Sequence, residues 1–490
     1  MTDPTVPWRR LDARSVLVSA AWLVPPLLST ALTLLLTGGE INLPALITLG
    51  SIFLTFLGIA AVFLLRQRTT RFRVTDQRVE VHSGVLFRRR RAVPRARIRG
   101  VDLTASPMHR LLGLRAVRIS TGQDSDADSR ELVLDGVSVA SAEELRQRLF
   151  AGGAGRPIAT IDWRWLRYAP LTMWGYAGIG VILGTFFELV DALRINPADI
   201  GVLRGIARGI TALPLWASIV IPLIVVVAVG AAGGVLALIE NWWGFQLEHA
   251  DRALRSRRGL FTTRSFWLEK RRLRGLQVAE PVLLRWAGGA RLNAIAVGLG
   301  NSDDSSISRR SVLLPPAPLA EVHRVAAVVL DESPDVISRI RLRGHPQAAL
   351  RRRLGWGIGL VMLAEVPLVV LGVVLTEVLL HIAWASALVL LPVAVLAALD
   401  AHRSLGHAVD GPYLVTRYGT FLRRTVLIDC AGIIGWRVTQ SFFQRRAGLL
   451  TISPVVAAGR GAYKVRDVAV ADGLEIAEKA TPGMMTSFLE

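Results

Sequence analysis

Two runs of basic side chains have the clearest capacity to bind a charged partner. They are Arg88, Arg89, Arg90, Arg91, Arg95, Arg97 and Arg99, then Lys270, Arg271, Arg272 and Arg274 at matching positions of a later segment. A cationic residue next to a membrane gains roughly 1 kcal/mol from an anionic leaflet. We expect these residues to face anionic headgroups or a protein partner. The alternative, that they only set membrane topology and solvate a domain surface, stays open at this stage.

Glu365 is the second candidate, because it lies in the middle of an apolar run, Val361-Met-Leu-Ala-Glu-Val-Pro-Leu. An ionisable side chain at that depth is costly and suggests function by default. A transporter or exporter that uses this carboxylate is therefore one hypothesis. A structural residue bonded to a neighbouring helix is the other, and no second intramembrane charge is an obvious partner.

The remaining reactive side chains favour no catalytic or metal chemistry. Asp124, Asp126 and Asp128, with Asp135 at the twelfth position, resemble a calcium loop, but Ser129 stands where glycine is required. We interpret this segment as a solvated hairpin loop. The eight histidines show no metal-ligand spacing, and Cys430 is interpreted as a structural thiol within a strand. The sequence predicts no metal, no cofactor and no enzyme.

The overall composition indicates a basic membrane protein. The chain has 490 residues, a net charge of +20 and 52% hydrophobic residues, and its mean hydropathy is +0.43. Apolar residues at this level coexist with 20% charged residues when they are concentrated in membrane spans. Nucleic acid is not an expected partner, because aromatic residues do not alternate with the basic ones.

A glycine pattern that occurs three times reveals the organisation of the chain. The glycines in each set are 16 and then 13 residues apart, and each set begins 19 or 20 residues after a long apolar stretch. A repeat of this length indicates duplicated domains. We expect the glycines to mark turns and bulges. The sets are Gly84, Gly100, Gly113; Gly259, Gly275, Gly288; and Gly419, Gly435, Gly448.

Six apolar stretches of roughly the length needed to cross a bilayer fall into three pairs. They are Val16–Leu36, Leu43–Leu65, Leu171–Val190, Leu213–Ile239, Gly355–Leu375 and His381–Leu399. Arginines follow the second stretch and precede the fifth, which by the positive-inside rule puts both termini in the cytoplasm. The turn within the middle pair contains Arg204 and Arg208, and a short amphipathic helix on the outer face is one reading of it.

Each pair is followed by a strand-rich segment that ends in a helix. Alternating residues around Thr75-Asp76-Gln77 predict a hairpin, and Asp410-Gly411-Pro412 predicts another. Ser141-Ala-Glu-Glu144 predicts a capping box before a helix at Leu145–Phe150. Pro318 precedes a predicted helix at Leu319–Leu330, and Asp472 opens the last one.

The paired spans are followed by an Arg-Ile-Arg-Gly-Val step and then by Arg110-Leu-Leu-Gly-Leu-Arg-Ala-Val. In these features the chain resembles the bacterial pleckstrin-homology membrane proteins of the YdbS/YdbT type. The resemblance is strongest in the first repeat and extends over nearly the whole chain as a three-domain, YdbT-like member. In the third repeat, Gly432-Ile-Ile-Gly435 replaces the basic residues before the second glycine. The resemblance implies a bent, seven-stranded β-sandwich or barrel with a C-terminal helix in each domain, and no known reaction.

The combined prediction is a multi-pass protein of the bacterial inner membrane with three cytoplasmic pleckstrin-homology-like domains. It acts as a non-enzymatic scaffold or envelope-associated accessory protein, with the transporter as its rival, and the first two domains carry any surface-binding function. The expected segments are 1–65 (tail and first helical pair), 66–152 (domain 1), 153–240 (second pair), 241–335 (domain 2), 336–400 (third pair) and 401–490 (domain 3).

Overall fold

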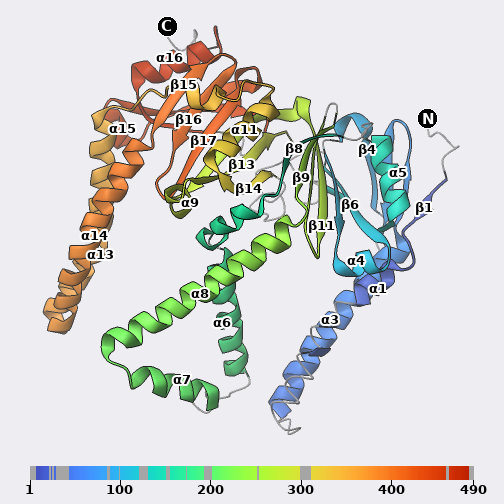
Figure 1. Cartoon of the computed structure of the whole chain (residues 1–490), viewed down its shortest axis with the longest axis horizontal. Helices are drawn as coiled ribbons and strands as arrows, with labels where there is room; N and C mark the ends of the chain where they lie inside the picture. Colours follow the sequence, from blue (N-terminus) through green and yellow to red (C-terminus); the bar gives the residue numbers. More distant parts are fainter. Residues whose placement is uncertain are drawn as a thin grey trace. The chain divides into compact units, whose positions relative to one another are not determined.

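The computed structural model covers most of the chain. It describes residues 7–20, 24, 27–28, 43–84, 89–98, 100–120, 131–149, 155–172, 174–192, 201–250, 253–297, 311–458 and 463–484. The described residues form two compact units, Met1–Lys270 and Arg271–Glu490, which are treated separately below. Figure 1 gives the element labels.

The first unit begins with a four-stranded antiparallel sheet in the order β1-β2-β3-β4. Its strands are β1 (Arg9–Arg10), β2 (Arg71–Val74), β3 (Arg78–Ser83) and β4 (Arg89–Pro94). The predicted hairpin at residues 75–77 is confirmed, since β2 and β3 pair directly. Thr75 closes the turn, because its hydroxyl accepts a hydrogen bond from the Arg78 amide at 3.1 Å.

A seven-stranded antiparallel sheet follows, in the order β7-β6-β5-β11-β10-β9-β8. The strands of the first repeat are β5 (Gly100–Ala105), β6 (Leu114–Ser120) and β7 (Glu131–Ser138); those of the second are β8 (Arg156–Thr160), β9 (Gln246–Ala250), β10 (Ala253–Arg258) and β11 (Thr263–Glu269). Two successive repeats therefore share one sheet, and they meet where β5 pairs with β11.

Helices complete the first unit. They are α1 (Ser15–Ala20), α3 (Leu43–Thr69), η2 (Arg95–Arg97), α4 (Pro107–Leu111), α5 (Val139–Leu149), η3 (Trp163–Leu171), α6 (Trp174–Ala192), α7 (Gly201–Thr211) and α8 (Leu215–Trp242). The segment with Arg204 and Arg208 is indeed a short helix, α7.

The capping box predicted at Ser141 is wrong. Helix α5 begins at Val139, directly after β7, so Ser141 lies inside the first turn. Ser138 takes the capping role instead, since its hydroxyl accepts a hydrogen bond from the Ser141 amide at 3.3 Å. The helix begins earlier than predicted because β7 continues directly into α5, with no loop between them.

The second unit repeats the shared-sheet arrangement in six strands, ordered β14-β13-β12-β17-β16-β15. These are β12 (Leu273–Pro281), β13 (Gly289–Ala296), β14 (Val312–Pro318), β15 (Gly406–Asp410), β16 (Tyr413–Tyr418) and β17 (Leu422–Asp429). The second and third repeats meet where β12 pairs with β17. A separate sheet of three strands contains β18 (Ile433–Thr439), β19 (Leu449–Val456) and β20 (Val465–Ala469).

The helices of the second unit are α9 (Val282–Trp286), α11 (Leu319–Leu330), α12 (Val336–Arg339), α13 (Gln347–Val374), α14 (Glu377–Arg403), η6 (Cys430–Gly432), α15 (Phe442–Arg446) and α16 (Val470–Ala480). The predicted helix at 319–330 is confirmed, as is the hairpin at 410–412. Cys430 lies in the turn η6, one residue beyond the end of β17.

Each helical pair follows a short strand that belongs to the domain after it. Strand β1 pairs with β2, and β8 pairs with β9, although a helical pair separates the partners in sequence. In the third repeat, Arg343 makes the equivalent bridge to His407, with N–O distances of 2.8 and 3.2 Å. The helical pair is thus inserted after the first strand of its domain, which holds both helix ends against one sheet.

The first and third domains have hydrophobic cores that join two sheets and a helix. Val79, Val101, Ile119 and Leu134 are fully buried together in the first, where Leu145 of α5 covers them. In the third, Val426, Ile452 and Val468 pack with Ile476 of α16.

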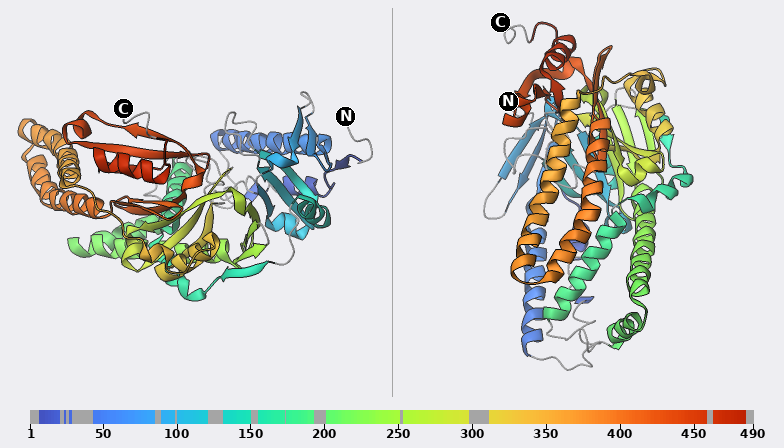
Figure 2. Two further views of the ribbon diagram at one scale, coloured as in Figure 1. Left: turned by 90° about the horizontal axis from the view of Figure 1, so that it is seen from above. Right: turned by 90° about the vertical axis from the view of Figure 1, so that its left-hand side faces the viewer.

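Four described helices are long and apolar enough to span a membrane: residues Gly50–Thr69 within α3, then α8, α13 and α14. Helices α13 and α14 pack side by side as a hairpin (Figure 2), with apolar side chains such as Leu363 and Leu388 exposed. Most of the predicted span at 16–36 lies outside the described residues, and α6 occupies most of the stretch 171–190. The structure therefore shows four spanning candidates, and six remains a prediction.

Candidate functional site

The basic cluster of the first repeat lies on the strand β4 and the turn η2. Arg90, Arg95 and Arg97 show exposed or half-buried side chains, and Arg91 is half-buried. The side chain of Arg89 and the whole of Arg88 and Arg99 lie outside the described residues. This cluster is a surface feature at the end of a sheet.

The second basic cluster occupies the equivalent turn. Lys270, Arg271 and Arg272 form η5, and Arg274 follows on β12, with its guanidinium 4.0 Å from Asp429. The third repeat has the same turn, η6, without cations. Each predicted cluster therefore includes the same repeated three-residue turn, η2 or η5, and extends onto a neighbouring strand.

Glu365 is buried between α13 and α14, and a hydroxyl lies against it. Ser386 Oγ is 3.1 Å from Glu365 Oε2 and also 2.7 Å from the carbonyl oxygen of Ile382. Glu365 is 6% exposed, and its Oε1 has no hydrogen-bond partner among the residues described. The side chain thus links two packed helices.

The structure assembles a different set of charges where α13 meets the third domain. Asp467, on β20, is 2% exposed, and its carboxylate binds two arginines of α13. Arg352 Nη1 lies 2.5 Å from Oδ1, and Arg353 Nη2 lies 3.1 Å from Oδ2. Asp467 has a φ of +56°, a left-handed conformation that aspartate tolerates better than most residues.

A third donor completes the coordination of Asp467. The Gln444 amide donates to Asp467 Oδ1 and to the Thr451 hydroxyl, both at 2.8 Å. Gln444 is itself fixed, because it forms a capping box with Ser441 at the start of α15. A buried carboxylate needs such partners to remain in the protein interior, so this network joins α13, α15 and β20 rigidly.

Two histidines extend the network toward β15. His345 Nδ1 lies 3.1 Å from the Asp467 carbonyl oxygen, and His407 Nδ1 lies 3.0 Å from His345 Nε2. Burial, followed by the proximity of His345, lowers the pKa of His407 to about 4. Burial also lowers the pKa of His345. Both rings are therefore neutral near pH 7.

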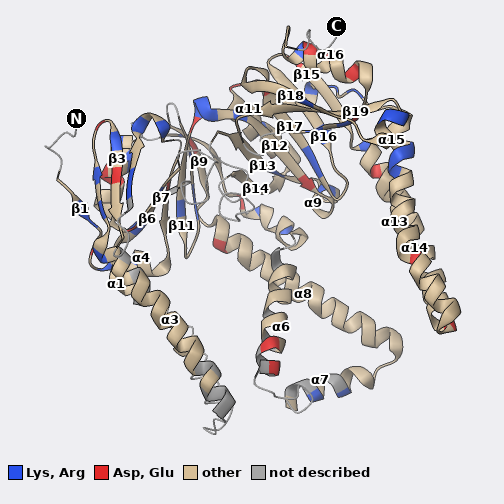
Figure 3. Cartoon of the chain, turned by 180° about the vertical axis from the view of Figure 1, so that it is seen from behind, with Lys and Arg blue, Asp and Glu red and all other residues tan. Residues whose placement is uncertain are grey.

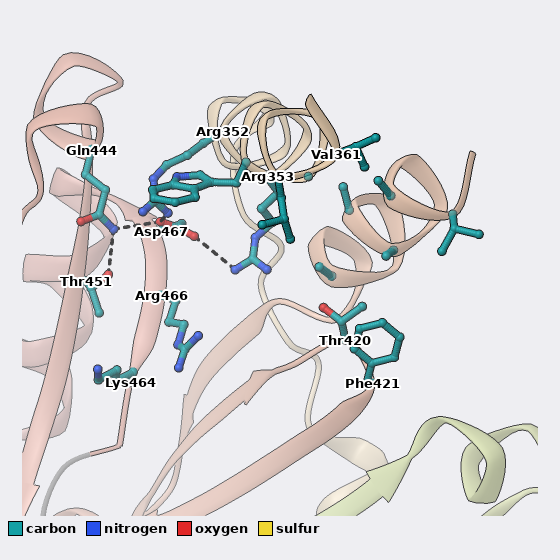
Figure 4. A pocket seen from close by; sticks show the side chains of 18 of the residues that line it. Arg352, Arg353, Val361, Thr420, Phe421, Gln444, Thr451, Lys464, Arg466 and Asp467 are labelled. Carbon is teal, nitrogen blue, oxygen red and sulfur yellow. Dashed lines mark hydrogen bonds and ion pairs between the residues drawn. The ribbon is translucent and has the colours of Figure 1, made fainter. Parts of the chain in front are cut away.

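A cavity of about 720 Å³ opens beside this network, as Figure 4 shows. Its polar side contains Arg352, Arg353, Lys464, Arg466 and Asp467, so the net formal charge of these five side chains is +3. Arg466 also stacks on Tyr418, with its guanidinium carbon 5.3 Å from the ring centroid.

The opposite side of the cavity is apolar and comes from the helical hairpin. It contains Trp356, Leu360 and Val361 of α13, with Leu390 and Val393 of α14. Charged and apolar surfaces thus meet at the domain end of two spanning candidates, and Figure 3 shows the basic residues there. Such a site suits an anion attached to a hydrocarbon chain.

A second cavity, of about 780 Å³, lies along another face of α13. Arg351, Arg352 and Arg446 contribute its charges, and Phe443 and Leu363 contribute to its apolar lining. The same combination of cations and apolar surface therefore occurs twice around one helix.

No cluster of metal-ligating side chains occurs in the parts of the chain that the structure describes. Burial raises the pKa of the Cys430 thiol, which makes it a poor nucleophile at neutral pH. The cavity offers cations and apolar surface to a ligand. Its described groups provide no acid, base and nucleophile in a catalytic arrangement.

The sequence pattern favours the first two repeats as binding surfaces and does not identify this site. The run Arg351-Arg352-Arg353 indicates membrane topology, and Asp467 has no recognisable signature. The signal in the sequence is weak: a single acidic residue next to Arg466 within a short strand, 114 residues from the nearest of its two arginine partners.

The comparisons with known proteins agree with this architecture. A family model described as "Bacterial PH domain" matches residues 26–152, 198–333 and 360–480. The chain is 20% identical over 428 residues to the UPF0699 transmembrane protein YdbT of Bacillus subtilis (strain 168), covering 82% of each protein. No solved structure shows a significant match. Because the family model matches well over half of the sequence in three copies, the chain belongs to the bacterial PH domain family, as a YdbT-like membrane protein with repeated domains.

Proposed function

We propose that this protein is a non-enzymatic scaffold of the bacterial inner membrane that binds an anionic lipid where its third helical pair meets its third domain. It has six spans in three pairs, and its three PH-like domains and both termini are cytoplasmic. The observation that carries the proposal is the cavity of about 720 Å³ with a cationic side and an apolar side.

The charges support a phosphate-bearing ligand. Asp467 engages Arg352 and Arg353 in ion pairs, whereas Lys464 and Arg466 line the same cavity from β20 and the residue before it. Guanidinium and ammonium groups are the usual partners of phosphate oxygens. Each is worth roughly 1 kcal/mol against anionic lipid near the membrane surface.

The apolar side supports a lipid over a free phosphate. Leu360, Val361 and Val393 belong to helices that are candidates for spanning the membrane, so the cavity continues onto a lipid-facing surface. An acyl chain would cover these side chains while its headgroup met the cations. Inorganic phosphate would gain only the polar contacts.

The environment of Glu365 supports the scaffold over the transporter. The carboxylate contacts Ser386 across two closely packed helices, as expected for a structural interhelical bond. The described groups around it provide no chain of ionisable side chains.

The experiment measures binding of the full-length protein in detergent by native mass spectrometry and thermal shift. The ligands are phosphatidylglycerol, phosphatidylcholine and inorganic phosphate. We expect phosphatidylglycerol to bind, and K464Q/R466Q to weaken it about 30-fold, which corresponds to about 1 kcal/mol for each cation. The matched control is R339Q/R341Q, which removes two exposed arginines that do not line the cavity.

Three results are decisive. Equal binding of phosphatidylglycerol by wild type and K464Q/R466Q would overturn the proposal. Equal stabilisation by inorganic phosphate would replace the lipid with a soluble anion. A similar loss in both double variants would reduce the effect to overall charge.

A further inference from the structure

The repeats join through one particular pair of strands, and this happens twice. β5, the first strand of one three-stranded half, pairs with β11, the last strand of the next repeat's first half. β12 pairs with β17 in the same way. We call each of these two strand pairs a joint. The register is also the same, since Gly100 lies opposite Leu268 and Gly275 lies opposite Ile428.

The same two kinds of strand end a sheet elsewhere in the chain. The glycine spacing makes β4 the counterpart of β11 and β17, and β18 the counterpart of β5 and β12. Among the described strands, β4 neighbours only β3, and β18 neighbours only β19. Each therefore has an edge of the kind that its counterparts use for joining.

The repeated glycine is explained at the two existing joints but not at β18. A Cβ on Gly275 would lie 2.1 Å from the Leu427 carbonyl oxygen of the partner strand. A Cβ on Gly100 would meet Phe266 and the Trp267 carbonyl at 3.3 Å. At Gly435, no described atom lies within 4 Å of that position. The glycine at β18 fits a strand that approaches from outside.

Burial shows the same difference. Leu103 on β5 and Val278 on β12, each three residues after the repeated glycine, are 3% and 1% exposed. Their counterpart on β18, Val438, is 47% exposed. The position that is buried at both joints is therefore exposed to solvent at β18, where Val438 occupies it.

The side chains next to the repeated glycine are apolar on both strands of each joint. Val101 lies opposite the larger Trp267, and Leu276 lies opposite Leu427. The same register would place Trp436 of β18 opposite Ala92 of β4. A large residue against a small one conserves the packed volume.

We propose that β18 of one copy pairs antiparallel with β4 of a second copy, in the register that sets Gly435 opposite Val93. The interface joins two different surfaces, so it builds a ring or an open chain of copies. It continues the two internal joints from one molecule into the next, and the proposal does not rest on lipid binding.

One pair in this register is unfavourable. Arg437 lies opposite Arg91, on the face away from Trp436. Arg437 is exposed, so salt screens the repulsion. The stem of Arg90 would lie opposite Val438 and shield it from water. We therefore expect association to strengthen as the salt concentration rises.

Disulfide trapping in native membranes tests the register. Two full-length copies with different tags are co-expressed in a Cys430→Ser background, one with the cysteine on β4 and the other on β18. The pairs are Arg90→Cys with Val438→Cys, and Arg91→Cys with Arg437→Cys. Adjacent antiparallel pairs alternate in Cα separation between about 4.5 and 5.5 Å, and both values suit a disulfide.

Two controls accompany these pairs. Thr104→Cys with Arg264→Cys, within one chain, tests the existing β5–β11 joint and the oxidation itself. Val93→Cys with Val438→Cys is out of register, and it should give much less product than the in-register pairs.

The expected result is a species with the mass of two chains that carries both tags, formed by at least one in-register pair. A dimer from Val438→Cys alone would show that β18 pairs with itself and would overturn the proposal. An intrachain disulfide when both cysteines are on one chain, without any two-tag product, would assign the closure to a single molecule. Absence of product when the β5–β11 control is oxidised would also overturn it.

Discussion

The basic cluster of the first domain and the charged junction of the third differ in what holds their cations. Arg95 and Arg97 lie on a three-residue turn, half-buried and exposed respectively, and the sequence displays them as a dense run. Arg352 and Arg353 are mostly buried and share one carboxylate that comes from a distant strand. A dense run of cations in the sequence thus marks a charged surface. The ordered site instead depends on ion pairs between residues that are far apart in the sequence.

The largest expected effect comes from Asp467→Asn. Asparagine retains the shape and tolerates the left-handed backbone, so the change mainly removes charge. The two arginines would remain mostly buried without a counterion, and we expect the unfolding free energy to fall by about 3 kcal/mol. Thermal unfolding of the full-length protein, followed by tryptophan fluorescence, measures this.

Asp472→Asn provides the matched control. Asp472 pairs with Arg343 at 3.1 Å, but the Arg343 side chain is 58% exposed. Such a pair is worth less than about 1 kcal/mol. Equal losses in the two variants would mean that burial does not distinguish the junction from ordinary surface charge.

A pH dependence of stability is the next largest effect, and His407 of the junction should contribute most of it. The pKa of His407 is lowered to about 4, so the unfolded chain binds more protons than the folded one between about pH 6.5 and 4. Stability is then complete above this window and falls as the pH decreases through it, by about 3 kcal/mol in total.

Burial and the groups around His407 fix the sign of this effect. Burial lowers its pKa most, His345 and Arg343 also disfavour its protonation, and Asp472 and Glu475 only partly oppose them. Unfolding midpoints from pH 7.5 to 4.5, in wild type and His407→Asn, test it. The variant should lose most of the slope; an unchanged slope would assign the acid sensitivity to other groups.

Local features of the fold were predictable from the sequence, and the joints were not. Turn chemistry located the hairpins at Thr75–Gln77 and Asp410–Pro412, because neighbouring residues determine them. The pairing of β5 with β11 depends on edges about 160 residues apart, and alternation along a strand does not encode which edge meets which.

The candidate site escaped prediction for a related reason. Its cations come from the start of an apolar helix, where arginine is expected for topology alone. Asp467 acquires its role only when α13 is placed against β20. The first-domain cluster was visible because its residues are consecutive, a property that has no connection with burial.

Arg95→Gln with Arg97→Gln should have a smaller effect, and of a different kind. Arg97 is exposed and Arg95 is half-buried on a surface turn, so their contribution to binding phosphatidylglycerol vesicles is at most about 1 kcal/mol each, and salt should largely screen it. Vesicle flotation at 50 and 500 mM NaCl compares this variant with K464Q/R466Q. The cavity variant should stay defective at high salt. A reversed order would place the lipid contact on the first domain.

Glu365→Gln should have the smallest effect, and it separates burial from charge pairing. Glu365 is buried, as Asp467 is, yet its described partner is the Ser386 hydroxyl rather than a cation. Glutamine can keep that contact by donating its amide to the hydroxyl, so we expect stability to change by less than about 0.5 kcal/mol. Glu365→Ala, which removes the contact, is the comparison and should cost about 1 kcal/mol.

The cellular test is complementation of a deletion strain exposed to membrane-active compounds. A transporter that moves protons through this carboxylate would lose function in Glu365→Gln while keeping its stability, and that combination would favour transport over the scaffold.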